Sequence, residues 1–177
     1  MKVLFLDRDG VINHDHGYVH LWKNFKLIEG TIKALQNATK KNYKIIIITN
    51  QSGIARGFYT EDQLKNLMTN LYKYLQMYSI EILDYFYCPH HPDASLIKYK
   101  MKCNCRKPKP GMFLQAIDKY NICLKESVMV GDKITDLEAA RNAGIKNLFL
   151  VGPDLKDNKI DSFNKYKNLK SCIDDIS

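Results

Sequence analysis

The chain has 177 residues, of which 45% are hydrophobic and 26% charged, and its formal net charge is +8. This composition is that of an ordinary globular protein, and no apolar run approaches the roughly 20 residues that a membrane-spanning helix requires. The amino terminus, Met1–Asp7, lacks the longer apolar segment and the cleavage site of a signal peptide, so we expect a cytoplasmic protein. The length predicts one domain that spans residues 1–177.

The positive charge leaves two explanations open. Lys, Asn and Ile are all abundant, so the charge can reflect a lysine-rich proteome; it can also reflect an anionic partner such as nucleic acid, a membrane surface or a small substrate. A local excess of positive charge favours an anionic partner. No acidic residue lies between Asp93 and Asp118, a segment that carries Lys98, Lys100, Lys102, Arg106, Lys107 and Lys109.

A buried strand over Lys2–Leu6 leads into two aspartates, Asp7 and Asp9, and Gly10 marks the turn that follows. Two carboxylates this close repel each other unless a cation or a shared proton separates them. The carboxyl end of a strand is also where open α/β sheets bind ligands. We therefore expect a divalent cation, a proton-transferring pair, or both, at this point of the chain.

Helices and strands alternate along the rest of the chain. Apolar residues at helical spacing predict the helices, and apolar β-branched runs predict buried parallel strands. In chain order we expect a helix over Thr31–Lys41, a strand over Lys44–Ile48, a helix capped by Thr60, a strand over Ile82–Tyr87, a helix over Met112–Tyr120, a strand over Ser127–Val130, a helix over Thr135–Ala143, a strand over Asn147–Val151 and, in a polar tail from Pro153, a last helix over Leu169–Ile176. The alternation predicts an α/β fold with a mainly parallel sheet and helices on both faces.

Polar residues directly follow several of the predicted strands: Asp7 with Asp9, Thr49 with Asn50, the segment from Cys88 onward, and Asp132. Because the carboxyl ends of parallel strands meet at one edge of a sheet, we expect these residues to converge. Carboxylates suit Mg²⁺, and Arg106, Lys107 and the Thr49 hydroxyl suit phosphate oxygens. One aspartate can also serve as a nucleophile toward phosphorus.

Three of the five cysteines, Cys88, Cys103 and Cys105, cluster with His90 in a segment of about residues 88–105. In a reducing compartment, such clustering favours a metal over a disulfide. The Cys-x-His and Cys-x-Cys pairs supply four ligands of the kind that hold tetrahedral Zn²⁺, and a site filled by four protein ligands is structural. His91 competes with His90 for the fourth position.

Four motifs occur in the order found in the haloacid dehalogenase superfamily of phosphatases, which this chain resembles from about Lys2 to Val151. They are Asp7-Arg8-Asp9-Gly10-Val11, then Thr49, then Lys107, then Gly131-Asp132 with Asp136. The resemblance implies a Rossmann-like three-layer sandwich with no large cap domain. Many members have threonine at the position of Val11, although both residues occur there.

Longer stretches resemble the D,D-heptose 1,7-bisphosphate phosphatases: Asp15–Tyr18, Thr49–Gly53, Cys88–His90 and Cys103–Gly111. This resemblance implies Mg²⁺-dependent hydrolysis of the C7 phosphate of D-glycero-D-manno-heptose 1,7-bisphosphate to heptose 1-phosphate, in the ADP- or GDP-heptose biosynthesis that serves lipopolysaccharide. It also selects His90 over His91 as the zinc ligand. Histidinol-phosphate phosphatase shares much of the pattern and remains an alternative.

The resemblance further implies a role for each site residue. Asp7 is the nucleophile that forms an aspartyl phosphate, Asp9 is the general acid and base, and Thr49 and Lys107 stabilise the phosphoryl group. Mg²⁺ is assigned to Asp7, Asp132 and the backbone carbonyl of Asp9, and structural Zn²⁺ to Cys88, His90, Cys103 and Cys105. Substrate contacts are expected from Asp15, His16, Gly17, Tyr18, Asn50, Gln51, Ser52, Arg106 and Lys133.

Two assignments have simpler alternatives. Asp136 either orients the metal shell or Lys133, or is only an acidic residue that favours the start of a helix. Lys109 is expected in solvent, because Lys107 occupies the motif position.

We expect a monomer that binds a small phosphorylated sugar and binds neither nucleic acid nor membrane. A nucleic-acid 3′-phosphatase would fit the basic charge, but the charge gathers beside the predicted active site and the sequence has no aromatic-basic strip for a strand. A non-catalytic phosphosugar- or zinc-binding module would most simply arise by loss of Asp7 or Asp9, and both are present.

Overall fold

The computed structural model describes residues 1–152 and 163–176. Within these residues the strands form one parallel sheet in the order β3-β2-β1-β4-β5-β6. The strands are β1 (Val3–Leu6), β2 (Lys44–Asn50), β3 (Ile82–Cys88), β4 (Val128–Gly131), β5 (Asn147–Val151) and β6 (Asn164–Tyr166). The predicted parallel sheet is confirmed, with the short edge strand β6 added to it.

The inner strands β1 and β2 are buried on both faces, and their side chains alternate between the two. In β1, Leu4 and Leu6 pack into one apolar core, whereas Val3 and Phe5 pack into a second core on the opposite face. The run Ile45–Ile48 in β2 divides in the same way. This double burial explains why both strands are apolar at every position between their polar ends.

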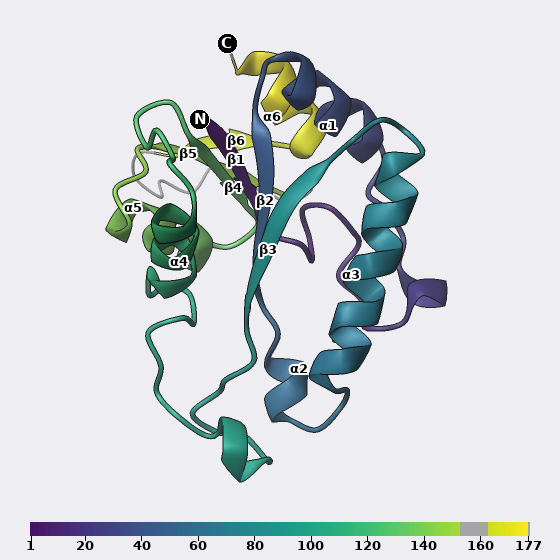
Figure 1. The fold of residues 1–177 in the computed structure, drawn as a ribbon, viewed down its shortest axis with the longest axis vertical. Helices are drawn as coiled ribbons and strands as arrows, with labels where there is room; N and C mark the ends of the chain where they lie inside the picture. The colour runs from purple at the N-terminus through teal and green to yellow at the C-terminus, as the bar shows by residue number, and fades with distance from the viewer. Residues whose placement is uncertain (153–162, 177) are drawn as a thin grey trace.

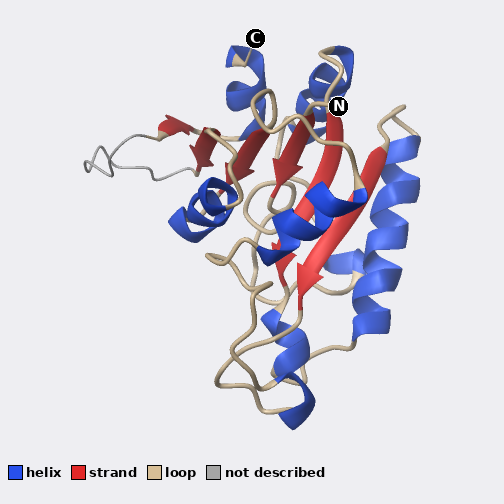
Figure 2. Ribbon diagram, turned by 60° about the vertical axis from the view of Figure 1, so that its left-hand side comes forward, coloured by secondary structure: helices blue, strands red, loops and turns tan. Residues whose placement is uncertain are grey.

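Helices cover both faces of the sheet, and Figure 2 shows the strands between them. The core that contains Leu4 and Leu6 is closed by α1 (Thr31–Lys40), α3 (Glu61–Gln76) and α6 (Leu169–Asp175). The opposite core is closed by α4 (Gly111–Lys119) and α5 (Ile134–Asn142), which lie together on the other side of the sheet in Figure 1. The predicted three-layer α/β fold is therefore confirmed.

The predicted start of α3 is confirmed in detail. The hydroxyl of Thr60 accepts a hydrogen bond from the backbone N–H of Gln63, and the Gln63 side chain accepts one from the backbone N–H of Thr60. This capping box satisfies two backbone donors that the first helical turn leaves without partners. The short helix α2 (Ser52–Ala55), directly after β2, was not predicted.

The last predicted helix is present as α6, while residues 153–162 of the polar tail lie outside the described part of the chain. In the described residues, no helix combines the length and apolar character that crossing a bilayer would demand.

Candidate active site

Side chains from the carboxyl ends of β1, β2 and β4 meet around a cavity of about 480 Å³. It is lined by Asp7, Asp9, Asp15, Gly17, Tyr18, Thr49, Asn50, Gln51, Ser52, Tyr59, Arg106, Lys107, Lys133, Thr135 and Asp136. The structure thus brings together the four predicted catalytic side chains and most of the expected substrate contacts. It places His16 elsewhere, in a neighbouring pocket with His20, Lys23 and Lys26.

Lys107 lies at the centre of the buried part of the site. Its ammonium is 2.8 Å from Oδ1 of Asp7 and 2.7 Å from Oδ1 of Asp136, and it also donates to the backbone carbonyl of Ile48. Burial alone would lower the pKa of Lys107, but the carboxylates of Asp136 and Asp7 raise it above its ordinary value. Lys107 is therefore a permanent buried cation. Burial raises the pKa of Asp7, and Lys107 opposes that rise.

Asp132 completes a group of carboxylates. One oxygen from each of Asp7, Asp132 and Asp136 lies within 4.8 Å of the others, and Oδ1 of Asp132 is buried with no hydrogen-bond partner. Burial and the charge of Asp7 raise the pKa of Asp132 to about 7. A buried carboxylate oxygen without a partner, beside other carboxylates, fits a hard divalent cation that takes oxygen ligands.

Gly10 permits this approach of Asp132. Its φ of +86° is a left-handed conformation that side chains disfavour, and a Cβ on Gly10 would lie 2.4 Å from Oδ2 of Asp132. The glycine after the paired aspartates is thus required both by the turn and by the neighbouring carboxylate.

Asp136 contacts two elements of the site. Its Oδ2 accepts a hydrogen bond from the backbone N–H of Lys133 at the start of α5, and its Oδ1 holds the ammonium of Lys107. Asp136 therefore lies at the start of a helix, as one alternative expected, and also forms an ion pair with Lys107. Its contact with Lys133 is to the backbone and not to the side chain.

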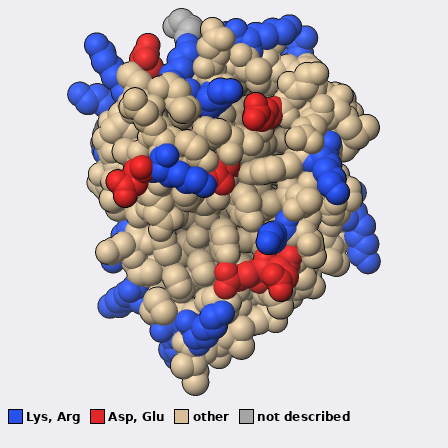
Figure 3. Space-filling model, in the orientation of Figure 1, with Lys and Arg blue, Asp and Glu red and all other residues tan. Residues whose placement is uncertain are grey.

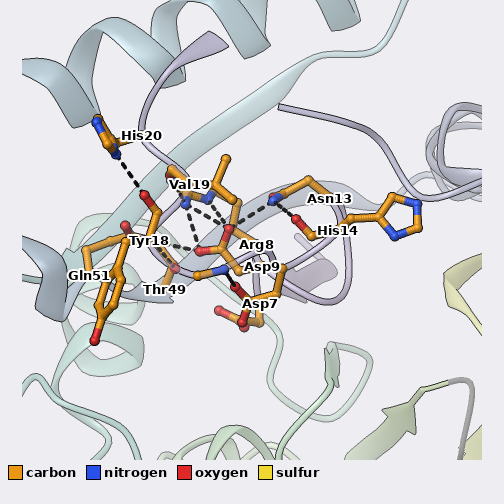
Figure 4. Close-up of polar contacts among 12 residues, drawn as sticks. Asp7, Arg8, Asp9, Asn13, His14, Tyr18, Val19, His20, Thr49 and Gln51 are labelled. Carbon is orange, nitrogen blue, oxygen red and sulfur yellow. Dashed lines mark hydrogen bonds and ion pairs between the residues drawn. The ribbon is translucent and has the colours of Figure 1, made fainter. Parts of the chain in front are cut away.

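Asp9 lies in a dense set of hydrogen-bond donors, shown in Figure 4. Nε and NH2 of Arg8 contact its carboxylate at 3.2 and 2.7–2.8 Å, and the amides of Asn13 and Gln51 donate to it at 2.9 and 3.1 Å. Arg8 is fully buried and also donates to the backbone carbonyl of Val19. The sequence does not indicate this role of Arg8, because an arginine between two aspartates is typical of a solvated charge.

Thr49 and Asn50 end β2 beside these groups. The Thr49 hydroxyl is 2.8 Å from the amide nitrogen of Gln51 and lines the cavity. The Asn50 amide pairs with the backbone of Lys107: its oxygen accepts from the Lys107 N–H at 3.1 Å, and its nitrogen donates to the Lys107 carbonyl at 3.3 Å. Asn50 was expected to contact substrate, and in this structure its amide holds the loop that carries Lys107.

Basic and polar residues form the outer part of the cavity. The Lys133 ammonium is 3.6 Å from Asp132 and 3.9 Å from Asp15, while Arg106 reaches toward the backbone carbonyl of His90 at 3.5 Å. Lys109 is exposed, as predicted. On the face drawn in Figure 3, Lys and Arg side chains are dispersed among other residues and form no continuous strip.

A second candidate metal site lies in the loop after β3. Atoms of Cys88, His90, Cys103 and Cys105 all lie within 4.8 Å of one another, with Cys105 Sγ 3.3 Å from Nδ1 of His90 and 3.0 Å from Sγ of Cys88. Three thiols and an imidazole nitrogen at these separations suit a tetrahedral soft or borderline cation. His91 does not join the cluster and accepts from the backbone N–H of Asp93.

Comparison with known proteins agrees with this geometry. The model of the haloacid dehalogenase-like hydrolase family matches residues 2–144. The chain belongs to this family. It is 48% identical over 151 residues to the D-glycero-beta-D-manno-heptose-1,7-bisphosphate 7-phosphatase of Haemophilus ducreyi, covering 85% of this chain and 82% of that protein. It is 47% identical over 152 residues to the corresponding alpha-heptose enzyme of Photorhabdus laumondii, covering 85% and 82%.

A solved structure of a related phosphatase has the same fold as this chain. The D,D-heptose 1,7-bisphosphate phosphatase from B. bronchiseptica, complexed with magnesium and phosphate, superposes with a TM-score of 0.82 at 29% identity. The match covers 98% of this chain and 97% of that chain. The family match and these relatives identify the chain as a phosphoric monoester hydrolase.

In this haloacid dehalogenase-like hydrolase, Glu61 anchors the loop of residues 88–105 at a second point. Its carboxylate accepts hydrogen bonds from the hydroxyls of Tyr87, which precedes Cys88, and Tyr99, which lies in the 3-10 helix Ile97–Tyr99. Lys98 adds an ion pair at 3.8 Å. Hydrogen bonds from Tyr87 and Tyr99 lower the pKa of Glu61 below its ordinary value of 4.5.

We predict that Glu61→Gln lowers the stability of the hydrolase at neutral pH and that the difference from wild type narrows in acid. A carboxylate with a lowered folded-state pKa contributes stability above its ordinary pKa and loses it as the pH falls through the lowered value. Thermal unfolding between pH 7 and pH 3 measures this difference. Glu81→Gln, at an exposed carboxylate 3.9 Å from Lys44, is the control and should show no comparable narrowing. A Glu61→Gln defect of equal size at every pH would contradict the prediction.

Proposed function

We propose that this chain hydrolyses the C7 phosphate of D-glycero-D-manno-heptose 1,7-bisphosphate to give heptose 1-phosphate, through an aspartyl-phosphate intermediate. The observation that carries the proposal is the convergence of Asp7, Asp9, Thr49 and Lys107 on one cavity, in a chain 45–48% identical to enzymes named for this reaction. Relatives named for the alpha and for the beta anomer match almost equally, so the proposal covers ADP- and GDP-heptose biosynthesis alike.

Asp7 and Asp9 share the covalent chemistry. A carboxylate oxygen of Asp7 attacks the phosphorus, the bond from phosphorus to the sugar oxygen breaks, and Asp9 gives its proton to that departing oxygen. In the second step a water attacks the phosphorus of the phosphoaspartate and gives a proton to Asp9. The bond between phosphorus and the Asp7 oxygen then breaks, which releases inorganic phosphate and leaves Asp7 as a carboxylate and Asp9 protonated, as at the start.

Lys107 and Thr49 hold the phosphoryl group during both steps. The Lys107 ammonium is already fixed between Asp7 and Asp136, so it stabilises developing negative charge without reorganising. Asp7, Asp132 and the backbone carbonyl of Asp9 would hold Mg²⁺, and Asp136 fixes the lysine beside them. When bound, Mg²⁺ supplies positive charge that offsets the charges of the phosphate and of the nucleophile.

We assign the sugar and its second phosphate to the outer part of the cavity. Asp15, Gly17, Tyr18 and Ser52 line it and offer hydrogen-bonding groups to a polyol. Lys133 and Arg106 line the same cavity and carry the positive charge that a second phosphate requires.

We propose that Zn²⁺ occupies the Cys88, His90, Cys103 and Cys105 cluster in a structural role. Four protein ligands leave no open position for a reacting water. Cys105 directly precedes Arg106 and Lys107, so fixing Cys105 also fixes the two basic residues of the phosphate site.

The same proposal places the enzyme in the cytoplasm as a monomer. The five cysteines form no disulfide, which fits a reducing compartment. On the face drawn in Figure 3, the basic side chains form no continuous track for a nucleic-acid strand.

We predict that the enzyme releases phosphate from heptose 1,7-bisphosphate only with Mg²⁺, and that Asp7→Asn reduces turnover to background while the protein stays folded. A phosphate-release assay on both anomers of the bisphosphate, histidinol phosphate and a 3′-phosphorylated oligonucleotide tests this, with and without Mg²⁺. Turnover of histidinol phosphate or of the oligonucleotide alone would replace the proposed substrate. No turnover of any substrate would indicate a binding module.

We predict that Cys105→Ser releases zinc and lowers the Tm by on the order of 5 °C or more. Cys105 is not one of the proposed catalytic residues, so any loss of activity should follow from the loss of zinc and stability. Metal content by mass spectrometry of the purified protein and a thermal unfolding curve measure the two effects. The matched control is Cys123→Ser, which removes a thiol outside the cluster. Retention of one zinc per chain in Cys105→Ser would exclude the proposed ligand set.

A further inference from the structure

The amide of Gln51 joins three side chains of the active site. Its nitrogen donates to the Thr49 hydroxyl at 2.8 Å and to Oδ2 of Asp9 at 3.1 Å, and its oxygen accepts from the hydroxyl of Tyr59. Gln51 is 2% exposed. Both hydrogens of its amide nitrogen are therefore used inside the protein, although the sequence predicted a substrate contact for this residue.

The orientation of this amide is fixed by chemistry. Oδ2 of Asp9 accepts hydrogen bonds from both Arg8 and Gln51, so the amide nitrogen of Gln51 faces Asp9 and the amide oxygen faces away. Tyr59 meets that oxygen as a donor. Burial raises the pKa of Tyr59 far above its ordinary value, so its hydroxyl keeps the proton that it donates. A flipped amide would place its nitrogen against the Tyr59 proton and its oxygen against Asp9.

Tyr59 is itself held on both sides. The ring of His20 stacks on it at a centroid distance of 4.9 Å, and Gly53 lies so close that a Cβ there would come within 2.1 Å of the ring. Only a glycine admits the tyrosine at this distance. The ring is 4% exposed, and its burial and contacts leave the hydroxyl directed at Gln51.

We propose that Gln51 and Tyr59 are positioning residues that aim the Asp9 carboxyl group at the departing oxygen of the substrate. This inference rests on the proposed function, in which Asp9 is the general acid. Because one nitrogen of Gln51 bonds to both Thr49 and Asp9, it fixes the distance between the phosphate site and the acid. Tyr59 prevents the amide from turning over.

A comparison of two leaving groups, one that needs a proton and one that does not, tests this positioning role. When the bond from phosphorus to a sugar oxygen breaks, the alkoxide must receive the proton of Asp9, whereas p-nitrophenolate leaves without one. The ratio kcat/KM reports only the steps up to departure of the leaving group. A misaimed Asp9 therefore lowers kcat/KM for the sugar phosphate and spares that for p-nitrophenyl phosphate.

The experiment compares Tyr59→Phe with wild type on these two substrates in saturating Mg²⁺. We expect kcat/KM for the heptose bisphosphate to fall by roughly 10-fold, part of the 10²–10⁴-fold that general acids contribute, and kcat/KM for p-nitrophenyl phosphate to change less than about 2-fold. Gln51→Glu keeps the acceptor for Tyr59 and places a carboxylate against Asp9. It should therefore lower kcat/KM for the heptose bisphosphate more than Tyr59→Phe does, and again lower it less for p-nitrophenyl phosphate. Tyr74→Phe removes the hydroxyl of an exposed hydrogen bond to Tyr78 and should leave both values unchanged.

The Asp9→Asn variant separates the positioning role of Gln51 and Tyr59 from the proposed role of Asp9 as general acid. If Asp9→Asn loses activity selectively on the sugar phosphate and the Tyr59 and Gln51 variants lose it equally on both substrates, or not at all, the positioning role is wrong and the proposed mechanism stands. If Asp9→Asn itself loses activity equally on both substrates, the assignment of Asp9 as general acid fails, and the positioning role fails with it.

Discussion

The ammonium of Lys107 between Asp7 and Asp136 is the interaction on which the rest of the site depends. Removing a charge from water costs several kcal/mol, and a buried ion pair offsets that cost only with close, well-formed contacts. Here the contacts are 2.8 and 2.7 Å. Without this cation, the carboxylates of Asp7, Asp132 and Asp136, within 4.8 Å of one another, would repel too strongly to remain together before a metal binds.

The segment that follows β2 shows how neighbouring residues serve separate contacts of that site. Thr49 lines the cavity, Asn50 holds the backbone of Lys107, Gln51 donates to Asp9, and Gly53 makes room for Tyr59. Side chains at the end of a strand and in the first turn of a helix point in different directions. One short segment therefore connects the cavity, the buried ammonium of Lys107 and the carboxyl group of Asp9.

Sequence patterns predicted what depends on local periodicity or on motif order. The isoleucine run of β2 and the alternation of strands and helices predicted the parallel sheet. The family motifs predicted that Lys107 and Asp132 lie close to Asp7. The short elements α2 and β6 carry too few residues to show a period. Arg8 and Tyr59 were not predicted for another reason: their contacts depend on burial that only the folded chain creates. His16, expected to contact substrate, lies in a neighbouring pocket.

The position of the loop of residues 88–105 also depends on tertiary contacts. Its apolar side chains Leu96, Ile97 and Met101 are 43%, 89% and 43% exposed, so the hydrophobic effect contributes little to its position. The Cys/His cluster brings its two ends together, and Glu61 contacts its middle through the hydrogen bond from Tyr99. Lys107 follows the cluster by two residues, so this loop leads directly into the buried cation of the active site. A loop with little apolar burial of its own is thus held beside the site by contacts among thiols, an imidazole and one carboxylate.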